Sequence, residues 1–218
     1  MQRETTKTAC RAGKAELAAL ETRIRACRVC VERPAGKPLP HEPRPVLQVS
    51  TTARIAICGQ APGTRVHASG RPFTDPSGER LRTWLGIGPE FFYDSSRVAI
   101  VPMGFCFPGL DEKGGDLPPR RECAPLWRRS IFDLMPDIEL IVLVGLYAQK
   151  WHIEGRPVRS LTETVEDWRS ISSTEAGPKL YPVPHPSWRN NAWIKRHPWF
   201  DSDLLPALRL DVRRVLKL

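Results

Sequence analysis

The chain has 218 residues, of which 41% are hydrophobic, so it is long enough to bury a core as one domain. Its 33 basic and 24 acidic residues give a net charge of +9, which favours a polyanionic partner such as nucleic acid. Its N-terminus does not resemble a signal peptide and no apolar run is long enough to span a membrane, so we expect a cytoplasmic protein without a membrane partner, and a monomer. In that compartment, six cysteines favour buried thiols, metal ligands or nucleophiles over a disulfide framework.

The N-terminal part of the chain predicts one short helix followed by a pair of cysteines. Residues 1–12 are polar and unpatterned and are expected to be loose, whereas apolar residues recur at helical spacing over 14–26. Cys27 and Cys30 follow directly, and two cysteines at this spacing can converge on one metal centre. Residues 31–45 are rich in proline and basic residues, which favours an extended connection to the first strand.

A buried-looking run over residues 55–58 predicts a parallel strand that ends in a tight loop of glycine and proline. Gly59 and Gly63 allow a ligand to approach the backbone, and Pro62 fixes one turn dihedral, so Gln60 is held in a defined direction. Strand-to-helix loops of any α/β protein also carry glycine and proline. The loop alone therefore fits a ligand site and a purely structural turn equally well.

Three further strands are expected, at residues 97–103, 140–144 and 180–183, with the last at a sheet edge because it contains prolines. Helices are expected over 77–85, with Ser77 as the N-cap, over 121–134 and over 202–218, whereas 155–178 shows no clear period.

The alternation of strands and helices predicts an α/β fold. We expect a single domain over residues 1–218, with a central four-stranded, mainly parallel sheet that is flanked by helices on both faces. Three distinctive loops follow these strands, and one of them carries His185. Because ligands of such sheets bind outside the carboxyl ends of the strands, the loops are expected to converge on one site.

Three segments together resemble the signature motifs of the uracil-DNA glycosylase superfamily: Gly59-Gln60-Ala61-Pro62-Gly63, Gly70-Arg71-Pro72-Phe73 and His185-Pro186-Ser187. Within it, the chain is most similar to the iron-sulfur branch (family four), whose first motif has glutamate where this chain has Gln60. The resemblance implies a uracil-DNA glycosylase-like fold and hydrolysis of the N-glycosidic bond of uracil, or of a related deaminated or damaged base. That base would be flipped out of DNA, in base excision repair.

The resemblance also implies roles for individual residues. His185 would stabilise the departing base, and Phe73 would stack on it. Gln60 would orient water, and Asp75 would supply the carboxylate that Gln60 lacks, although an exposed turn aspartate fits equally. Glycine at position 63, where family-one enzymes carry tyrosine, would leave room for 5-substituted bases. The expected base-binding set is Gly59, Ala61, Pro62, Gly63, Phe73, Pro102 and Met103.

Four cysteines fall where the iron-sulfur branch has its cluster ligands, namely Cys27, Cys30, Cys106 and Cys123. The resemblance therefore implies a structural [4Fe-4S] cluster, which needs four thiolates. The alternative is that Cys106 and Cys123 are ordinary small core residues.

The segment after His185 interleaves three tryptophans with basic residues, as a base-flipping protein requires at the mouth of its pocket. The alternative interpretation of this segment is that the tryptophans pack beneath a loop. The residues expected to contact DNA are Ser187, Trp188, Arg189, Asn190, Lys195 and Arg196. A second pair, His197-Pro198, follows no strand, so His185 is preferred.

Two departures from the family keep other functions open. An amide at Gln60 cannot act as a base. Pro102 stands where these families carry the asparagine that reads uracil, and proline has neither the asparagine side chain nor a backbone N–H. One alternative is a damaged-base DNA-binding protein with little or no turnover. The other is a cysteine-metal module that binds nucleic acid without glycosylase activity.

Overall fold

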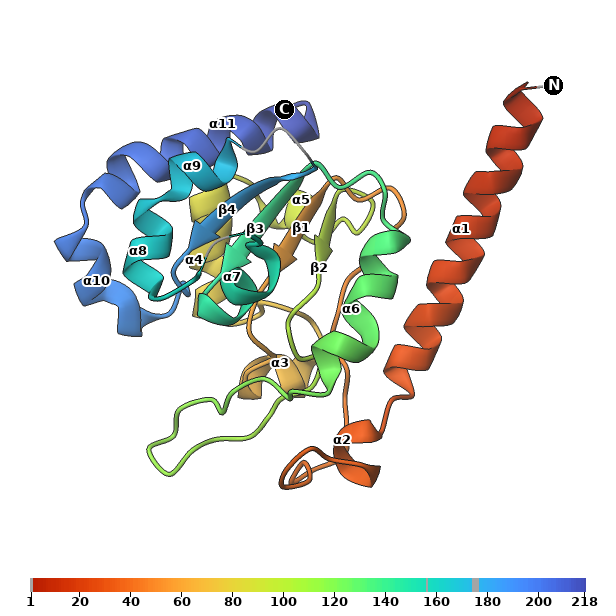
Figure 1. Cartoon of the computed structure of the whole chain (residues 1–218), viewed down its shortest axis with the longest axis horizontal. Helices are drawn as coiled ribbons and strands as arrows, with labels where there is room; N and C mark the ends of the chain where they lie inside the picture. Colours follow the sequence, from red (N-terminus) through yellow and green to blue (C-terminus); the bar gives the residue numbers. More distant parts are fainter. Residues whose placement is uncertain (1, 156, 174–176) are drawn as a thin grey trace.

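Four short strands form the centre of the fold, and every pairing between them is parallel (Figure 1). The computed structural model describes residues 2–155, 157–173 and 177–218. The strands lie in the order β2-β1-β3-β4, with bounds β1 Ile55–Cys58, β2 Val98–Ile100, β3 Leu140–Val144 and β4 Lys179–Val183. The predicted parallel α/β sheet is confirmed, and β4 lies at an edge as its prolines indicated. Strand β2 is shorter than expected because Pro102 cannot donate to a ladder.

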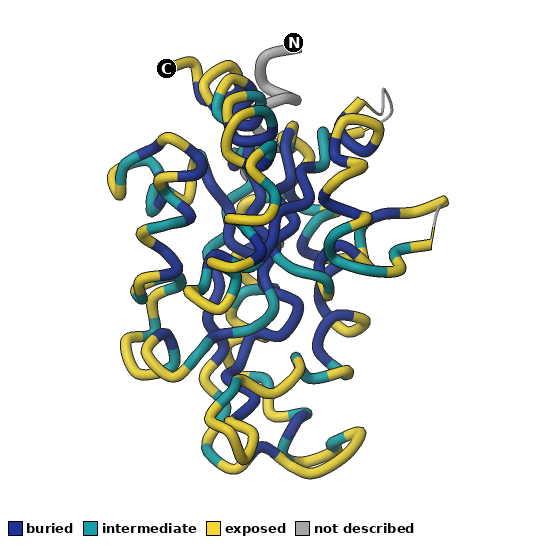
Figure 2. The backbone as a smooth tube through the Cα atoms, turned by 90° about the vertical axis from the view of Figure 1, so that its left-hand side faces the viewer, coloured by how far each residue is buried: buried dark blue, intermediate teal, exposed yellow. Residues whose placement is uncertain are grey.

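Helices cover both faces of the sheet and bury it in two cores. Ile55 and Ile57 pack with α4 and α11, whereas Ala56 and Cys58 belong to the core shared with α1, α6 and α7. The tube in Figure 2 shows the resulting buried centre between exposed outer turns. The bounds of these helices are α1 Gln2–Arg25, α4 Pro76–Leu85, α6 Cys123–Asp133, α7 Leu146–His152 and α11 Leu205–Leu216.

Several short helices lie in segments for which the sequence showed no clear period or favoured a loop. Two of them occupy the 155–178 segment, of which residues 156 and 174–176 lie outside the described part. The expected helix over 202–218 begins instead with a π-helical turn, η2. The bounds are α2 Val29–Glu32, α3 Thr64–Ser69, α5 Pro89–Phe92, α8 Leu161–Glu166, α9 Trp168–Ser172, η1 Trp188–Asn190, α10 Asn191–Arg196 and η2 Phe200–Leu204.

Two helix starts differ from the sequence prediction. Helix α1 begins at Gln2, within the segment expected to be loose, because 2–12 has no proline or glycine to stop the helix; Met1 lies outside the described residues. Helix α4 has Asp75 rather than Ser77 at its N-cap position, since Pro76 occupies the first helical position that proline favours. The expected irregular connection is confirmed for residues 33–45, whereas residues 31 and 32, which the prediction included, belong to α2.

Among the described residues, we find no helix with both the length and the apolar character that a membrane crossing requires.

Candidate active site

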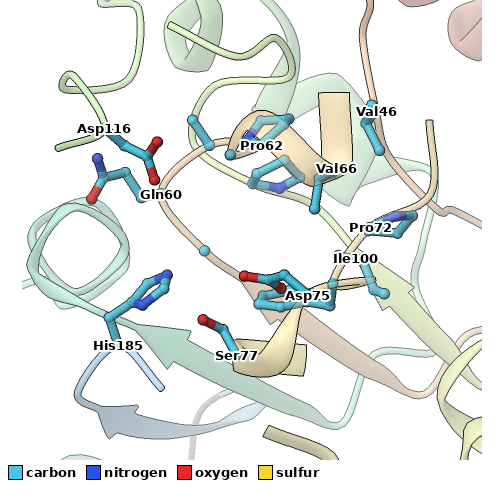
Figure 3. Close-up of a pocket in the computed structure, with 15 residues that line it drawn as sticks. Val46, Gln60, Pro62, Val66, Pro72, Asp75, Ser77, Ile100, Asp116 and His185 are labelled. Atoms are coloured by element: carbon cyan, nitrogen blue, oxygen red, sulfur yellow. The ribbon is translucent and has the colours of Figure 1, made fainter. Parts of the chain in front are cut away.

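One pocket opens at the carboxyl ends of the strands and collects residues from all three loops that the sequence singled out (Figure 3). Its empty volume is about 540 Å³ including the space at its open mouth, a size typical of ligand sites. The lining is Val46, Gly59, Gln60, Ala61, Pro62, Gly63, Val66, Pro72, Phe73, Asp75, Ser77, Ile100, Pro102, Asp116 and His185. The expected convergence of the three loops on one site is therefore confirmed.

The loop after β1 is fixed by backbone hydrogen bonds from the loop after β2. The N–H of Met103 donates to the Gly59 carbonyl at 2.8 Å, and the N–H of Gly104 donates to the Gln60 carbonyl at 2.9 Å. The side-chain Nε2 of Gln60 donates to the Leu117 carbonyl at 3.1 Å. Because that partner only accepts, it fixes which end of the amide is nitrogen. Oε1 accepts no hydrogen bond from the residues that the structure describes and is left as an acceptor.

Phe73 forms one wall of the pocket in a strained but well-supported conformation. Its φ of 52° lies in the left-handed region, and its carbonyl accepts a hydrogen bond from the Tyr93 hydroxyl at 2.9 Å. A Cβ at Gly78 would lie 1.9 Å from that carbonyl oxygen, so glycine is required there. The ring meets Phe92 edge-on at 5.9 Å and would lie 3.5 Å from a Cβ at Gly59. The ring is thus held against the first motif loop, where a flat base can stack on it.

His185 enters the pocket from the loop after β4 (Figure 3). Its carbonyl accepts a hydrogen bond from Asn190 Nδ2 at 2.7 Å, which fixes the loop. Burial lowers the pKa of the imidazole, the Asp75 charge raises it, and the Arg189 charge lowers it further, with a net lowering. The ring is therefore neutral at neutral pH and can donate one hydrogen bond to a developing anion.

Two carboxylates face this pocket, and the sequence pointed to one of them. Asp75 lies at the N-terminus of α4 without a side-chain capping bond, so its carboxylate is free to face the pocket. Asp116 lies at the rim beside Gln60 (Figure 3). Asp116 is an exposed residue, but loss of solvent on the pocket side of its carboxylate raises its pKa, as do the nearby Asp75 and Asp111 charges, while Arg189 opposes them. The site thus holds more negative charge than the first motif indicates.

Pro102 and Met103, both expected to contact the base, are placed differently by the structure. Pro102 lines the pocket and offers it no N–H. Met103 is buried, lies outside the lining, and uses its own N–H in the bond to Gly59. Neither residue therefore presents a donor to the pocket in place of an asparagine side chain.

The tryptophan-rich segment after His185 divides between surface and core. Trp188 is 72% exposed in η1 next to Arg189, whereas Trp193 is buried and Trp199 is packed against it. The interpretation of three tryptophans at the pocket mouth is thus wrong for two of them, because Trp193 turns from α10 into the core and Trp199 follows it. Of the residues expected to contact DNA, Asn190 lies in η1 and Ser187 directly precedes it, while Lys195 and Arg196 are exposed on α10. His197 stacks on Trp193 and lies outside the pocket.

A second cavity brings together the four cysteines that the sequence singled out. Cys27, Cys30, Cys106 and Cys123 line it with apolar neighbours, although they come from segments far apart in the chain. The N–H of Phe105 points at the Cys123 sulfur at 3.3 Å, and the backbone of Arg44 donates to Cys106. Within the described residues, no three acidic, histidine or cysteine side chains meet at the spacing of a single metal ion.

Burial dominates the protonation of these thiols. It raises the pKa of Cys106 to about 12 and raises the pKa of Cys30 and of Cys123 as well. At Cys30 the charge of Arg120 and a hydrogen bond from it oppose this rise in pKa without reversing it. Cys58, in contrast, is buried in β1 away from this cavity, as expected for a core residue.

Sequence reasoning missed Asp116 among the polar pocket residues. Asp116 belongs to a polar stretch with two preceding glycines, which signals a turn but not the direction in which the turn folds. Ser77 was noticed as a helix cap and not as a pocket residue. Both reach the pocket through tertiary packing that no local motif records.

Comparison with known families gives one match. The model of a family described as the uracil DNA glycosylase superfamily matches residues 47–209, which include the first motif loop, Phe73, Asp116 and His185. The match does not extend to Cys27 and Cys30. Since it covers most of the chain and every polar residue of the pocket, the chain belongs to the uracil DNA glycosylase superfamily.

Proposed function

We propose that this protein is a DNA glycosylase that hydrolyses the N-glycosidic bond of uracil, or of a related deaminated or damaged base, flipped out of DNA. One observation carries the proposal: the first motif loop, the Phe73 ring and the His185 imidazole surround a single pocket at the carboxyl edge of the sheet. The net charge of +9 suits the DNA backbone. The reaction would open base excision repair.

Breaking the glycosidic bond leaves negative charge on the base and positive charge on the sugar. Neutral His185 would donate a hydrogen bond to the departing base, and a donor preorganised in this way contributes roughly a hundredfold to a thousandfold in rate. Phe73 would hold the base by stacking. The free Oε1 of Gln60 would accept a hydrogen bond from water and orient it, without taking its proton.

The chemistry of the pocket wall widens the range of candidate bases beyond uracil. Pro102 leaves the pocket without the donor that an asparagine side chain would direct at a pyrimidine edge. We therefore include hypoxanthine, xanthine and 5-hydroxymethyluracil beside uracil as candidate bases.

The test is base release from oligonucleotides that carry each of these four bases, detected as alkali-labile abasic sites. Single-stranded DNA should be tried first because it removes the cost of unpairing. We expect release of at least one base and a loss of about a hundredfold or more in His185→Ala. His197→Ala is the matched control, since that histidine lies outside the pocket. Release that survives His185→Ala but not His197→Ala would overturn this assignment of roles.

A second candidate function is a protein that binds damaged DNA with little turnover. It is favoured by Gln60, whose amide is held by Leu117 and has no basic group. Tighter binding of modified than of unmodified DNA, without release of any base, would support it over the glycosylase. The cysteine-metal module remains a third candidate, and it predicts no preference for modified DNA.

The proposal includes a [4Fe-4S] cluster held by Cys27, Cys30, Cys106 and Cys123. The donor set fits, because four sulfurs line one apolar cavity and backbone N–H groups point at two of them. In a four-iron cluster each cysteine binds a different iron, so the sulfurs need not meet at the spacing of one ion. Such a cluster would connect the N-terminal segment to α6 and would have a structural role.

The cluster is tested by iron and acid-labile sulfide analysis of protein purified without oxygen. We expect brown protein with about four irons per chain. Cys123→Ala should lose the iron, whereas Cys58→Ala, a buried cysteine outside the cavity, should keep it. Colourless protein containing zinc, or no metal at all, would exclude the cluster.

A further inference from the structure

A small hairpin after β2 carries Asp116 to the first motif loop. We call residues 109–117 the 109–117 hairpin, because Leu110 and Asp116 form an antiparallel bridge and the Leu117 N–H donates to the Gly109 carbonyl at 2.9 Å. Asp111 closes its tip by accepting from the backbone N–H of Gly115 at 2.7 Å. The hairpin is thus a hydrogen-bonded unit rather than a loose loop, and Asp116 has a defined position.

The hairpin docks on the first motif loop at two points. Gln60 donates to the carbonyl of Leu117, the residue after Asp116. A Cβ placed on Gly63 would lie 3.4 Å from Oδ2 of Asp116, so the carboxylate fills the space beside that glycine. The room that glycine leaves at position 63 is therefore bordered by Asp116: a Cβ would just touch the carboxylate, and a larger group placed there would meet it.

The carboxylate of Asp116 is available for chemistry. Among the residues that the structure describes, none donates a hydrogen bond to it. Loss of solvent and the Asp75 and Asp111 charges raise its pKa against the opposing Arg189 charge, which makes it a stronger base than an ordinary aspartate. Gln60 beside it has a free Oε1. A water molecule between them could donate one hydrogen bond to the amide oxygen, which would orient it, and could lose its other proton to the carboxylate. General base catalysis requires both interactions.

We infer that Asp116 is the carboxylate that deprotonates the hydrolytic water and offsets the positive charge of the sugar, in place of an acidic side chain at position 60. The inference rests on the proposed function. As the C1′–N bond breaks, its electron pair stays on the base, which later takes a proton from solvent. The water oxygen bonds to C1′, its proton passes to Asp116, and from there the proton returns to solvent.

Asp75 is less suited to this role although it also faces the pocket. Its charge acts on His185, raising the pKa of that ring. Asp75 lies after Phe73 at the start of α4, whereas Asp116 lies beside Gln60 (Figure 3). We therefore assign Asp75 to the electrostatic environment of His185, as a positioning residue, and expect Asp75→Asn to alter the pH dependence of base release more than its rate at neutral pH.

The first experiment compares single-turnover base release by wild type, Asp116→Asn and Glu112→Gln. Asparagine keeps the shape of the aspartate and removes its basicity, so Asp116→Asn should slow release by about a hundredfold or more while DNA affinity stays within about twofold. Glu112 is an exposed acid on the same hairpin, and its substitution should leave release unchanged. Undiminished release by Asp116→Asn would overturn the inference while leaving the proposed function intact.

A second experiment does not depend on turnover. Wild type should bind DNA with a cationic pyrrolidine in place of the target sugar about tenfold more tightly than DNA with a neutral tetrahydrofuran, because a nearby carboxylate attracts the cation. Asp116→Asn should lose that preference and Glu112→Gln should keep it. If no base is ever released yet the preference depends on Asp116, the proposed turnover fails and the charge assignment stands. A preference that persists in Asp116→Asn would overturn the inference.

Discussion

The base pocket and the cysteine cavity lie in one domain but are built in contrasting ways. The base pocket is formed by loops at the carboxyl edge of the sheet and holds polar side chains, including Gln60, Asp75 and His185, at an open mouth. The cysteine cavity lies among α1, α2 and α6 and combines four sulfurs with apolar side chains such as Ile24 and Trp127. An open pocket with polar side chains suits a ligand that enters and leaves, whereas a cavity lined by thiols suits the permanently bound cluster proposed above.

The two cavities rest on different parts of the sequence. The family match starts at residue 47, so it includes the whole first motif and His185 but excludes Cys27 and Cys30. Half of the cysteine set therefore lies in an N-terminal segment outside the matched residues. We expect each cavity to be alterable without immediate loss of the other, and four predictions examine that independence, from the largest effect to the smallest.

The largest effect is expected from Cys27→Ala. If a cluster ties α1 to α6, its loss should remove the iron and lower the thermal unfolding midpoint together, since metal binding and folding are coupled. Iron analysis and calorimetry of the same sample measure both. Cys58→Ala should keep the iron. Retention of full stability by iron-free Cys27→Ala would show that the cavity has no structural role.

Arg128 lines neither cavity, but it joins α6, the helix that carries Cys123 of the cysteine cavity, to the end of β2 beside the base pocket. Its guanidinium is fully buried and donates to the carbonyls of Val101 at 2.6 Å and Pro102 at 2.8 Å, and Pro102 lines the base pocket. No carboxylate pairs with it in the described part of the chain. Arg128→Met should therefore lower the free energy of unfolding by about 1–3 kcal/mol for each carbonyl left without a donor.

Urea unfolding measures this loss, with the exposed neighbour variant Arg129→Met as the control. Arg128→Met should also slow base release, because the Pro102 wall loses its anchor. If stability falls while base release per folded molecule is unchanged, the two cavities are independent despite the contact that Arg128 makes with Pro102.

A smaller effect is expected from the basic residues outside the base pocket. Replacing Arg189, Lys195 and Arg196 with alanine should flatten the salt dependence of DNA binding, by about 0.7 to 0.9 in the logarithmic slope for each phosphate that is no longer neutralised. Arg213→Ala is the control, since the end of α11 packs near the amino ends of the strands, where Arg97 donates to Leu216. An unchanged slope in the triple variant would place the DNA path elsewhere.

The smallest effect concerns His152, whose Nε2 lies 2.5 Å from Nη2 of Arg128. Burial, aided by the Arg128 charge, lowers the pKa of His152 to about 3 in the folded protein. The unfolded chain therefore binds a proton that the folded chain does not as pH falls below about 6.5, and stability is lost by up to about 1.4 kcal/mol per pH unit. Urea midpoints at pH 7.5 and 5.5 should differ less in His152→Gln than in wild type. An identical pH dependence would mean that the ring is protonated in the fold.

Local sequence was enough to predict where the strands lie, that the sheet is parallel, and which loops form most of the pocket. Continuous apolar runs such as 140–144 have one stable place, a strand covered on both faces, and the structure has β3 at those bounds. Glycine and proline at 59–63 fix the loop after β1 through local dihedral limits, and His185 follows a strand that prolines confine to the edge. These features are local, so residue order suffices to find them.

Other features depend on packing between distant segments and were visible only in the folded chain. It turned Trp193 into the core and left Trp188 outside, although both stand in one basic, aromatic stretch. It also brought Asp116 beside Gln60 through a hairpin whose direction depends on hydrogen bonds to Gly109 and Leu117. Local sequence cannot specify such contacts, because the energy that selects them comes from burial and hydrogen bonding with residues far along the chain.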